Sequence, residues 1–91
     1  MDYLNSNKYA MHIEQKCKKI KGYVLEFWEQ PNSEFTTSQL IAFVNDKLGT
    51  NYTMPDTILR MMRFLKEENQ LDYICKSRRY MIYQKVYKDV N

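Results

Sequence analysis

The sequence holds few of the residues that make tight turns and metal sites. Only two of its 91 residues are glycine and two are proline, too few for a turn-rich β-sandwich or β-barrel. Gly22 and Gly49 stand alone, so the chain has no glycine-rich loop for cradling phosphates. The single histidine, His12, has no partner at metal-ligand spacing, and the two cysteines form no Cys-x-x-Cys pair. We therefore expect no metal and no other cofactor.

Catalytic constellations and long apolar runs are missing as well. No Ser/His/Asp, Cys/His or paired-carboxylate set falls on one predicted element, so we do not expect an enzyme. No stretch approaches the roughly 18 apolar residues of a transmembrane helix, and the polar start lacks a signal pattern. We therefore expect a cytoplasmic protein with no membrane partner, nucleoid-associated if its source is prokaryotic. There, Cys17 and Cys75 would be reduced, buried thiols, whereas an oxidising compartment would allow a disulfide.

The composition that is present suits one small folded domain. With 44% hydrophobic and 27% charged residues the chain is globular, and its length allows a single domain over 1–91. Apolar residues recur at helical spacing in three segments, which predicts helices over 8–29, 37–48 and 54–69, after an N-terminal extension. The predicted inner positions are Tyr9, Ile13, Cys17, Ile20, Val24, Phe27 and Trp28 in the first helix, Leu40, Ile41, Val44 and Leu48 in the second, and Ile58, Met62, Leu65 and Asn69 in the third.

Local signals predict where the second and third helices begin and end. Thr36, with Gln39 three residues later, fits a capping box at the start of the second helix. Gly49 fits the left-handed position that follows a last helical turn. After a short connection over 50–52, Thr53 is predicted to cap the third helix, with a proline in its first turn.

Strand signals precede the second helix and follow the third. A short extended segment is predicted over 34–36, and a hairpin over 71–86 with a tail after it. From Leu71 the apolar period changes from 3.6 to 2, and β-branched and aromatic residues become dense. The turn has no glycine or asparagine, so we expect a four-residue loop rather than a tight two-residue turn. The predicted loop covers 76–79, and the predicted pairs are Cys75 with Tyr80, Ile74 with Met81 and Tyr73 with Ile82.

Three segments carry a resemblance to a known family: Phe35-Thr36-Thr37-Ser38-Gln39-Leu40, Thr57-Ile58-Leu59-Arg60-Met61-Met62-Arg63-Phe64-Leu65, and Leu71 at the start of the hairpin. Their order resembles that of a winged helix-turn-helix domain of the kind found in small prokaryotic and viral transcription regulators. The resemblance covers roughly 8–87 and implies an α+β fold of three helices with a C-terminal β-hairpin wing. It rests on order and spacing, and the wing departs from several subfamilies because it is short and has no glycine at its tip.

The resemblance implies double-stranded DNA as the partner, with the third helix in the major groove and the wing on the backbone or in the minor groove. Thr57 and Arg60 would then face base edges, and Arg63 would lie near the backbone. Hydroxyls at helix starts and basic side chains at the wing tip would hold phosphates. The implied DNA-binding residues are Thr36, Thr37, Thr53, Thr57, Arg60, Arg63, Lys76, Arg78 and Arg79.

The distribution of charge is a separate indication of a nucleic-acid partner. The net charge is +4 over 8–21, −4 over 22–56 and +5 over 57–88, although the whole chain carries only +3. The basic excess therefore falls on the first helix, the third helix and the hairpin, where phosphate neutralisation would need it. Arg60 and Arg63 also fit ordinary solvated helix positions, and the nearby carboxylates would repel phosphate.

Two classes of function follow from these patterns. The first is a sequence-specific DNA-binding protein that regulates transcription. The alternative is a protein-interaction module on the same scaffold, such as an adaptor or an inhibitor of a host factor, which the acidic middle block and an exposed Phe64 favour. Dimers read two half-sites, and the first helix and the outer hairpin face are the two candidate homodimer interfaces.

Overall fold

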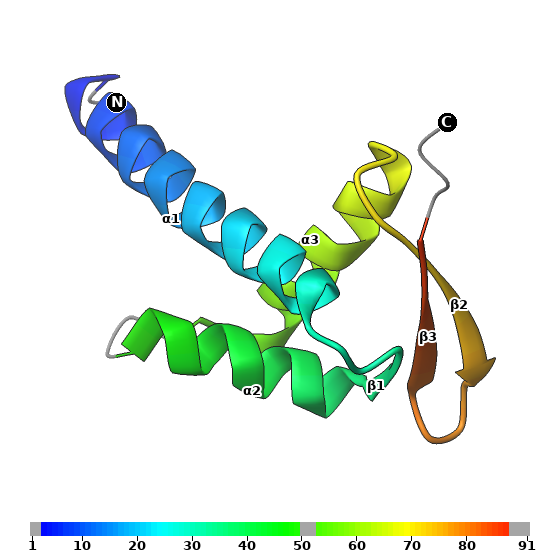
Figure 1. Ribbon diagram of the computed structural model, residues 1–91. Helices are drawn as coiled ribbons and strands as arrows, with labels where there is room; N and C mark the ends of the chain where they lie inside the picture. The colour runs from blue at the N-terminus through cyan, green and yellow to red at the C-terminus, as the bar shows by residue number, and fades with distance from the viewer. Residues whose placement is uncertain (1–2, 50–52, 88–91) are drawn as a thin grey trace.

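The computed structural model describes residues 3–49 and 53–87, with side chains described from residue 16 onward. This part of the chain is a small α+β domain with three helices and a three-stranded antiparallel sheet (Figure 1). The elements are α1 (Tyr3–Glu29), β1 (Glu34–Thr36), α2 (Thr37–Leu48), α3 (Pro55–Glu67), β2 (Asp72–Ser77) and β3 (Ile82–Val86).

The observed bounds agree closely with the predicted ones in the middle of the chain. The strand over 34–36 and the helix over 37–48 are confirmed as predicted. The first helix begins at Tyr3 rather than at residue 8, so the expected N-terminal extension is largely helical. The predicted connection over 50–52, the tail over 88–91, and the side chains of Tyr9, His12 and Ile13 lie outside the described residues.

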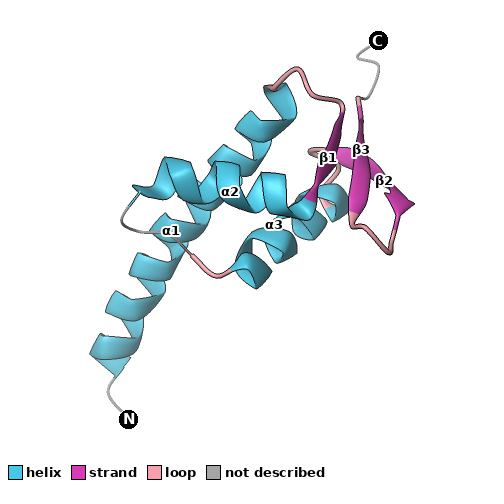
Figure 2. Ribbon diagram, turned by 90° about the horizontal axis from the view of Figure 1, so that it is seen from below, coloured by secondary structure: helices cyan, strands magenta, loops and turns pink. Residues whose placement is uncertain are grey.

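The three helices form one layer of the domain, and the sheet lies at one end of this helical layer. Figure 1 shows α2 and α3 against the C-terminal half of α1, while the N-terminal half of α1 extends away from both. Figure 2 shows the three strands gathered beyond the ends of the helices. The strand order is β1-β3-β2, so β3 is the central strand and the short β1 ties the α1–α2 connection to the hairpin.

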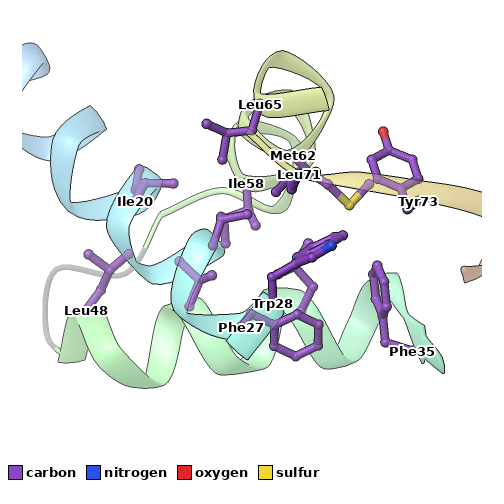
Figure 3. Packing of buried hydrophobic residues seen from close by; sticks show 13 residues of the cluster. Ile20, Phe27, Trp28, Phe35, Leu48, Ile58, Met62, Leu65, Leu71 and Tyr73 are labelled. Atoms are coloured by element: carbon purple, nitrogen blue, oxygen red, sulfur yellow. The ribbon is translucent and has the colours of Figure 1, made fainter. Parts of the chain in front are cut away.

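The core lies where the three helices meet the inner face of the sheet (Figure 3). Its aromatic centre is formed by Phe27, Trp28 and Phe35, whose rings meet edge to face at centroid distances of 5.2–6.1 Å. The predicted inner positions that are confirmed as buried are Ile20, Val24, Phe27 and Trp28 in α1, Leu40, Val44 and Leu48 in α2, and Ile58, Met62 and Leu65 in α3.

The ends of α2 follow their predicted signals. The Thr36 hydroxyl accepts from the backbone N–H of Gln39 at 3.2 Å, and the Gln39 side chain accepts from the Thr36 N–H at 2.8 Å. This capping box satisfies two donors that a helix start otherwise leaves unpaired. Gly49 follows the last turn with φ +63°, a conformation that an L side chain rarely adopts.

The predicted ends of α3 are wrong. Its N-cap is Met54, which makes no side-chain cap bond, whereas Thr53 is buried and donates its backbone N–H to Asn45 Oδ1 at 2.9 Å. Pro55 occupies the first helical position, which leaves Thr53 one residue too early to cap. The helix stops at Glu67, and Asn69 turns out to solvent with φ +60° instead of joining the inner stripe, because asparagine tolerates the left-handed conformation.

The predicted register of the hairpin is also wrong. Cys75 lies opposite Tyr83 and Tyr73 opposite Lys85, so β3 is displaced by three residues from the predicted pairing. The turn covers 78–81 rather than 76–79, and Met81 takes φ +55°. A displacement by an odd number of residues exchanges the two faces of a strand. Tyr83 therefore faces inward with Tyr73, and the outer face of the hairpin receives Ile82.

The two cysteines are free thiols, but neither is fully buried. Cys17 is half-buried on α1, and Cys75 is exposed on β2. The expectation of buried thiols is therefore wrong. Cys75 is exposed because it lies two residues nearer the turn than Tyr73. The helices cover the inner face of the sheet at Tyr73 but do not extend as far as Cys75.

A buried lysine joins the sheet to the end of α1, and the sequence patterns gave no sign of it. Lys85 is 3% exposed, and its Nζ donates to the carbonyl oxygens of Phe27 at 2.6 Å and Gln30 at 3.2 Å, and to Asn32 Oδ1 at 3.4 Å. Its backbone N–H donates to the Ser33 carbonyl at 2.7 Å. The ammonium thus satisfies carbonyl groups at the C-terminal end of α1.

Candidate nucleic-acid interface

The predicted DNA-binding residues fall on three neighbouring parts of the fold: the start of α2, the outer face of α3, and the hairpin. A small cavity of about 200 Å³ shows that these three parts adjoin one another. We call this cavity the notch. It is lined by Thr37 from α2, Leu59, Met62 and Arg63 from α3, Tyr73 and Tyr83 from the hairpin strands, and Met81 from the turn.

The outer face of α3 carries the predicted base-reading residues. Thr57 is half-buried in the first turn, and Arg60 is exposed. Arg60 Nε lies 2.8 Å from Asp56 Oδ2, an ion pair between two exposed side chains one helical turn apart. Exposed pairs of this kind stabilise a helix by about 0.5 kcal/mol or less, so the guanidinium can exchange partners at little cost. Phe64 is 46% exposed on the same helix.

Arg63 lies closer to the hairpin than Arg60 does. Its Nε donates to the Leu59 carbonyl oxygen at 3.3 Å, which directs the guanidinium back along the helix. The same side chain lines the notch with Thr37. The structure therefore brings together two of the predicted residues that are far apart in the sequence.

The hairpin presents two predicted arginines at its turn and keeps the lysine within a strand. Arg78 and Arg79 are exposed in the turn, and the Arg79 guanidinium lies 5.5 Å from the ring centroid of the exposed Tyr80. Lys76 is in β2 instead of at the tip, and its Nζ lies 3.0 Å from Glu34 Oε2. Two hydrogen bonds brace the turn, from the Met81 N–H to the Arg78 carbonyl and from the Tyr80 N–H to Ser77 Oγ.

Three of the four predicted threonines are already engaged within the fold. The hydroxyl of Thr36 is held in the capping box. Thr37 and Thr53 are each 8% exposed, and their backbone N–H groups donate to the Met81 carbonyl and to Asn45 Oδ1. Their placement makes them structural parts of the helix starts.

Acidic neighbours divide the basic side chains of this region into two groups. Arg60, Lys66 and Lys76 each lie within 4 Å of a carboxylate. Among the described side chains, which cover 16–49 and 53–87, no carboxylate lies within 4 Å of Arg63, Arg78 or Arg79. These three guanidinium groups are therefore available to an anionic partner without breaking an ion pair.

The two tyrosines of the notch were missed by sequence reasoning. Tyr73 and Tyr83 meet edge to face at 5.5 Å, and Tyr83 stacks on Phe35 at 5.8 Å. Burial raises the pKa of the Tyr73 phenol above its usual 10.0, Tyr83 raises it further, and the nearby charge of Arg63 lowers it. Period-2 alternation was the available signal, but it identifies Tyr83 as inward-facing only once the register is known.

Other kinds of site find no support in the described part of the chain. No group of three or more His, Cys, Asp or Glu side chains there is arranged to hold a metal ion. None of the described helices combines the length and apolar character needed to cross a membrane.

Comparison with known proteins adds no family assignment to this geometry. The chain matches no protein-family model and no curated protein.

Proposed function

We propose that this protein binds double-stranded DNA in a sequence-specific manner and acts as a transcription regulator. The observation that supports the proposal most is a set of three guanidinium groups that have no carboxylate partner among the described side chains. They are Arg63 on α3 and Arg78 and Arg79 at the hairpin turn. Phosphate binding needs basic groups gathered on neighbouring elements and free of competing carboxylates.

The layout of the domain is compatible with a winged helix. The order of helices and strands along the chain and the three-stranded antiparallel sheet both suit that interpretation. In this arrangement α3 enters the major groove, and the β2–β3 turn is the wing, which contacts the backbone or the adjacent minor groove. The notch then lies between the two contacts.

Thr57 and Arg60 are the proposed base readers. Both lie in the first half of α3, which faces base edges in the proposed docking, and Arg60 is held only by an exposed ion pair. An arginine fork spans the two acceptors of guanine, and a good contact of this kind discriminates between bases by about 1–3 kcal/mol. Arg63, Arg78 and Arg79 serve as backbone anchors, with Lys76 as a further cation once it leaves Glu34.

Selection of bound sites from a random duplex pool tests this function directly. Repeated rounds should enrich a common sequence, because base contacts from α3 distinguish one duplex from another. A palindromic consensus would indicate a dimer. A pool that remains random after several rounds would contradict sequence-specific binding.

A protein-interaction module remains the second candidate. Phe64 is exposed on α3, and the same helix carries the exposed carboxylates of Asp56 and Glu67, which do not favour phosphate. Protein partners recovered from a lysate should be lost on nuclease treatment if DNA bridges them, and should persist if the contact is direct.

We also propose that the protein forms a homodimer when it binds two DNA half-sites. The N-terminal half of α1 extends beyond the other helices (Figures 1 and 2), and the outer hairpin face exposes Ile74. Either could meet a second copy. Sedimentation at tens of micromolar decides the question, since a monomer there would remove the dimer from the proposal.

A further inference from the structure

The notch between α3 and the hairpin has phenol groups that are free to bind an outside partner. Tyr73 as a whole residue is only 7% exposed, but its hydroxyl is accessible to solvent and makes no hydrogen bond with another described residue. A hydroxyl with this access can donate to a ligand. Figure 3 shows the hydroxyl of Tyr73 turned away from Trp28, whose ring centroid lies 6.1 Å from that of Tyr73.

Further groups that suit an anion converge on the same cavity. The hydroxyl of Tyr83 also lacks a partner in the described part of the chain, and its ring contacts that of Tyr73. The Arg63 guanidinium lines the notch and lies near the Tyr73 phenol. The carboxylates of Asp72 and Glu67 also act on that phenol, but neither residue lines the notch. None of the described lining residues is acidic. The start of α2 reaches the notch through Thr37, which adds the positive end of a helix dipole.

The size and lining of the notch indicate which kind of anion it could bind. A cavity of about 200 Å³ exceeds what one water molecule occupies, and its apolar lining from Leu59, Met62 and Met81 suits the carbon atoms beside an ester oxygen. Two phenol donors and one guanidinium match the several acceptor oxygens of a phosphate group.

We propose that the notch binds a phosphate group through Arg63, Tyr73 and Tyr83, and that this phosphate belongs to the DNA backbone between the two grooves. The second half of the statement rests on the proposed function, in which α3 and the wing contact neighbouring grooves. The backbone that separates those grooves passes between α3 and the wing, where the notch lies.

Duplex affinity of matched hydroxyl deletions tests the proposal. Tyr73→Phe removes only the hydroxyl and keeps the ring in the core. It should weaken binding about tenfold for every duplex, because a hydrogen bond to a charged group is lost. The salt dependence should not change, since the phenol carries no charge. Arg63→Gln should weaken binding and also reduce the slope of log K against log salt by about one.

Tyr87→Phe is the control for these variants. The Tyr87 hydroxyl donates to the Trp28 carbonyl at 3.2 Å, at the opposite end of the hairpin strands from the turn, so its loss should leave duplex affinity unchanged. Folding of each variant is checked by circular dichroism at the assay temperature. If the wild-type protein binds DNA and Tyr73→Phe binds it equally well, the notch does not hold a backbone phosphate and the proposal is overturned.

A second experiment separates failure of the notch from failure of DNA binding. Amide signals of Thr37 and Tyr83 are followed by NMR while sodium phosphate replaces sodium chloride at constant ionic strength. Phosphate-specific shifts that vanish in the Tyr73→Phe/Arg63→Gln variant support the site. If the wild-type protein binds no duplex, the proposed function fails, and this titration alone tests phosphate binding in the notch. The absence of phosphate-specific shifts would then overturn the phosphate site as well.

Discussion

At the scale of single residues, Lys85 shows how a charged side chain can serve the core. Its Nζ lies 4.5 Å from the Phe27 ring centroid and 5.8 Å from that of Trp28. Its ammonium group then reaches the carbonyl groups that end α1. A buried charge is tolerated only when such acceptors compensate for the lost water. Lys85 is therefore a structural residue, although sequence reasoning counted it within the basic block of the hairpin.

Replacing Lys85 with methionine tests this structural role. Lys85→Met keeps most of the apolar stem but leaves the carbonyl groups of Phe27 and Gln30 without a buried donor, so unfolding free energy should fall by about 1–3 kcal/mol. Urea denaturation measures the change. Lys47→Met is the control, because Lys47 makes a half-exposed ion pair with Glu26 and lies 5.5 Å from the Phe43 ring centroid. Its replacement should change stability by about 0.5 kcal/mol or less.

The burial of Lys85 also predicts how the stability of the protein depends on pH. Burial lowers the pKa of Lys85 below 10.5, so between the two pKa values the unfolded chain binds more protons than the folded one. Stability contributed by this residue should therefore rise with pH in the window below 10.5. The measurement is the difference in unfolding free energy between wild type and Lys85→Met at several pH values up to 10.5. Tyr73 is present in both proteins, so this difference separates the contribution of Lys85 from that of Tyr73. A difference that falls with pH across this window would contradict it.

Two arginines should differ in what they contribute to DNA binding. Arg60→Ala should reduce discrimination between a selected site and a scrambled duplex, because Arg60 is the proposed base reader on α3. Arg78→Ala should weaken both duplexes about equally, because a wing-tip contact to phosphate carries no sequence information. Fluorescence anisotropy with both duplexes measures this. Equal behaviour of the two variants would refute the assignment of separate roles.

At the scale of elements, predictability followed the strength of local signals. β1 and α2 could be placed from sequence because the capping box at Thr36 and the glycine at 49 fix both ends through short-range chemistry. The hairpin register could not be placed. Its turn has no glycine or asparagine, and it depends on Met81 adopting a positive φ that side-chain type does not signal. Because Tyr80 and Ile82 alternate with Met81 and Tyr83, either face could have been the inner one.

The two glycines should respond to alanine in opposite ways. Gly22 lies exposed within α1, and a Cβ added there would meet no atom within 4 Å, so Gly22→Ala should raise the unfolding free energy by about 0.5–1 kcal/mol through helix propensity. Gly49 has φ +63°, so Gly49→Ala should lower it by about 1 kcal/mol through backbone strain. Thermal unfolding of both variants provides the test. A stabilised Gly49→Ala protein would show that the end of α2 differs from the one described.

At the scale of the whole molecule, the candidate interface was only partly visible in the sequence. The arginines of α3 and the turn could be found because charge blocks and helical periodicity are local patterns. Tyr73 and Tyr83 could not be placed in one cavity with Arg63, because their meeting depends on the hairpin register and on how α3 packs. Two ion pairs were likewise not visible from counting charges along the chain. The pair of Lys76 with Glu34 arises from the tertiary fold, and the pair of Lys66 with Asp72 arises from the α3–β2 connection.

The salt dependence of duplex binding tests the central claim most directly. If Arg63, Arg78 and Arg79 each neutralise a backbone phosphate, log K should fall linearly with log salt concentration, with a slope of about −3. The variant Arg78→Ala/Arg79→Ala should bind more weakly, with a slope smaller in magnitude by about two. Binding that is absent at low salt, or that shows no salt slope, would contradict a DNA-binding role for this protein.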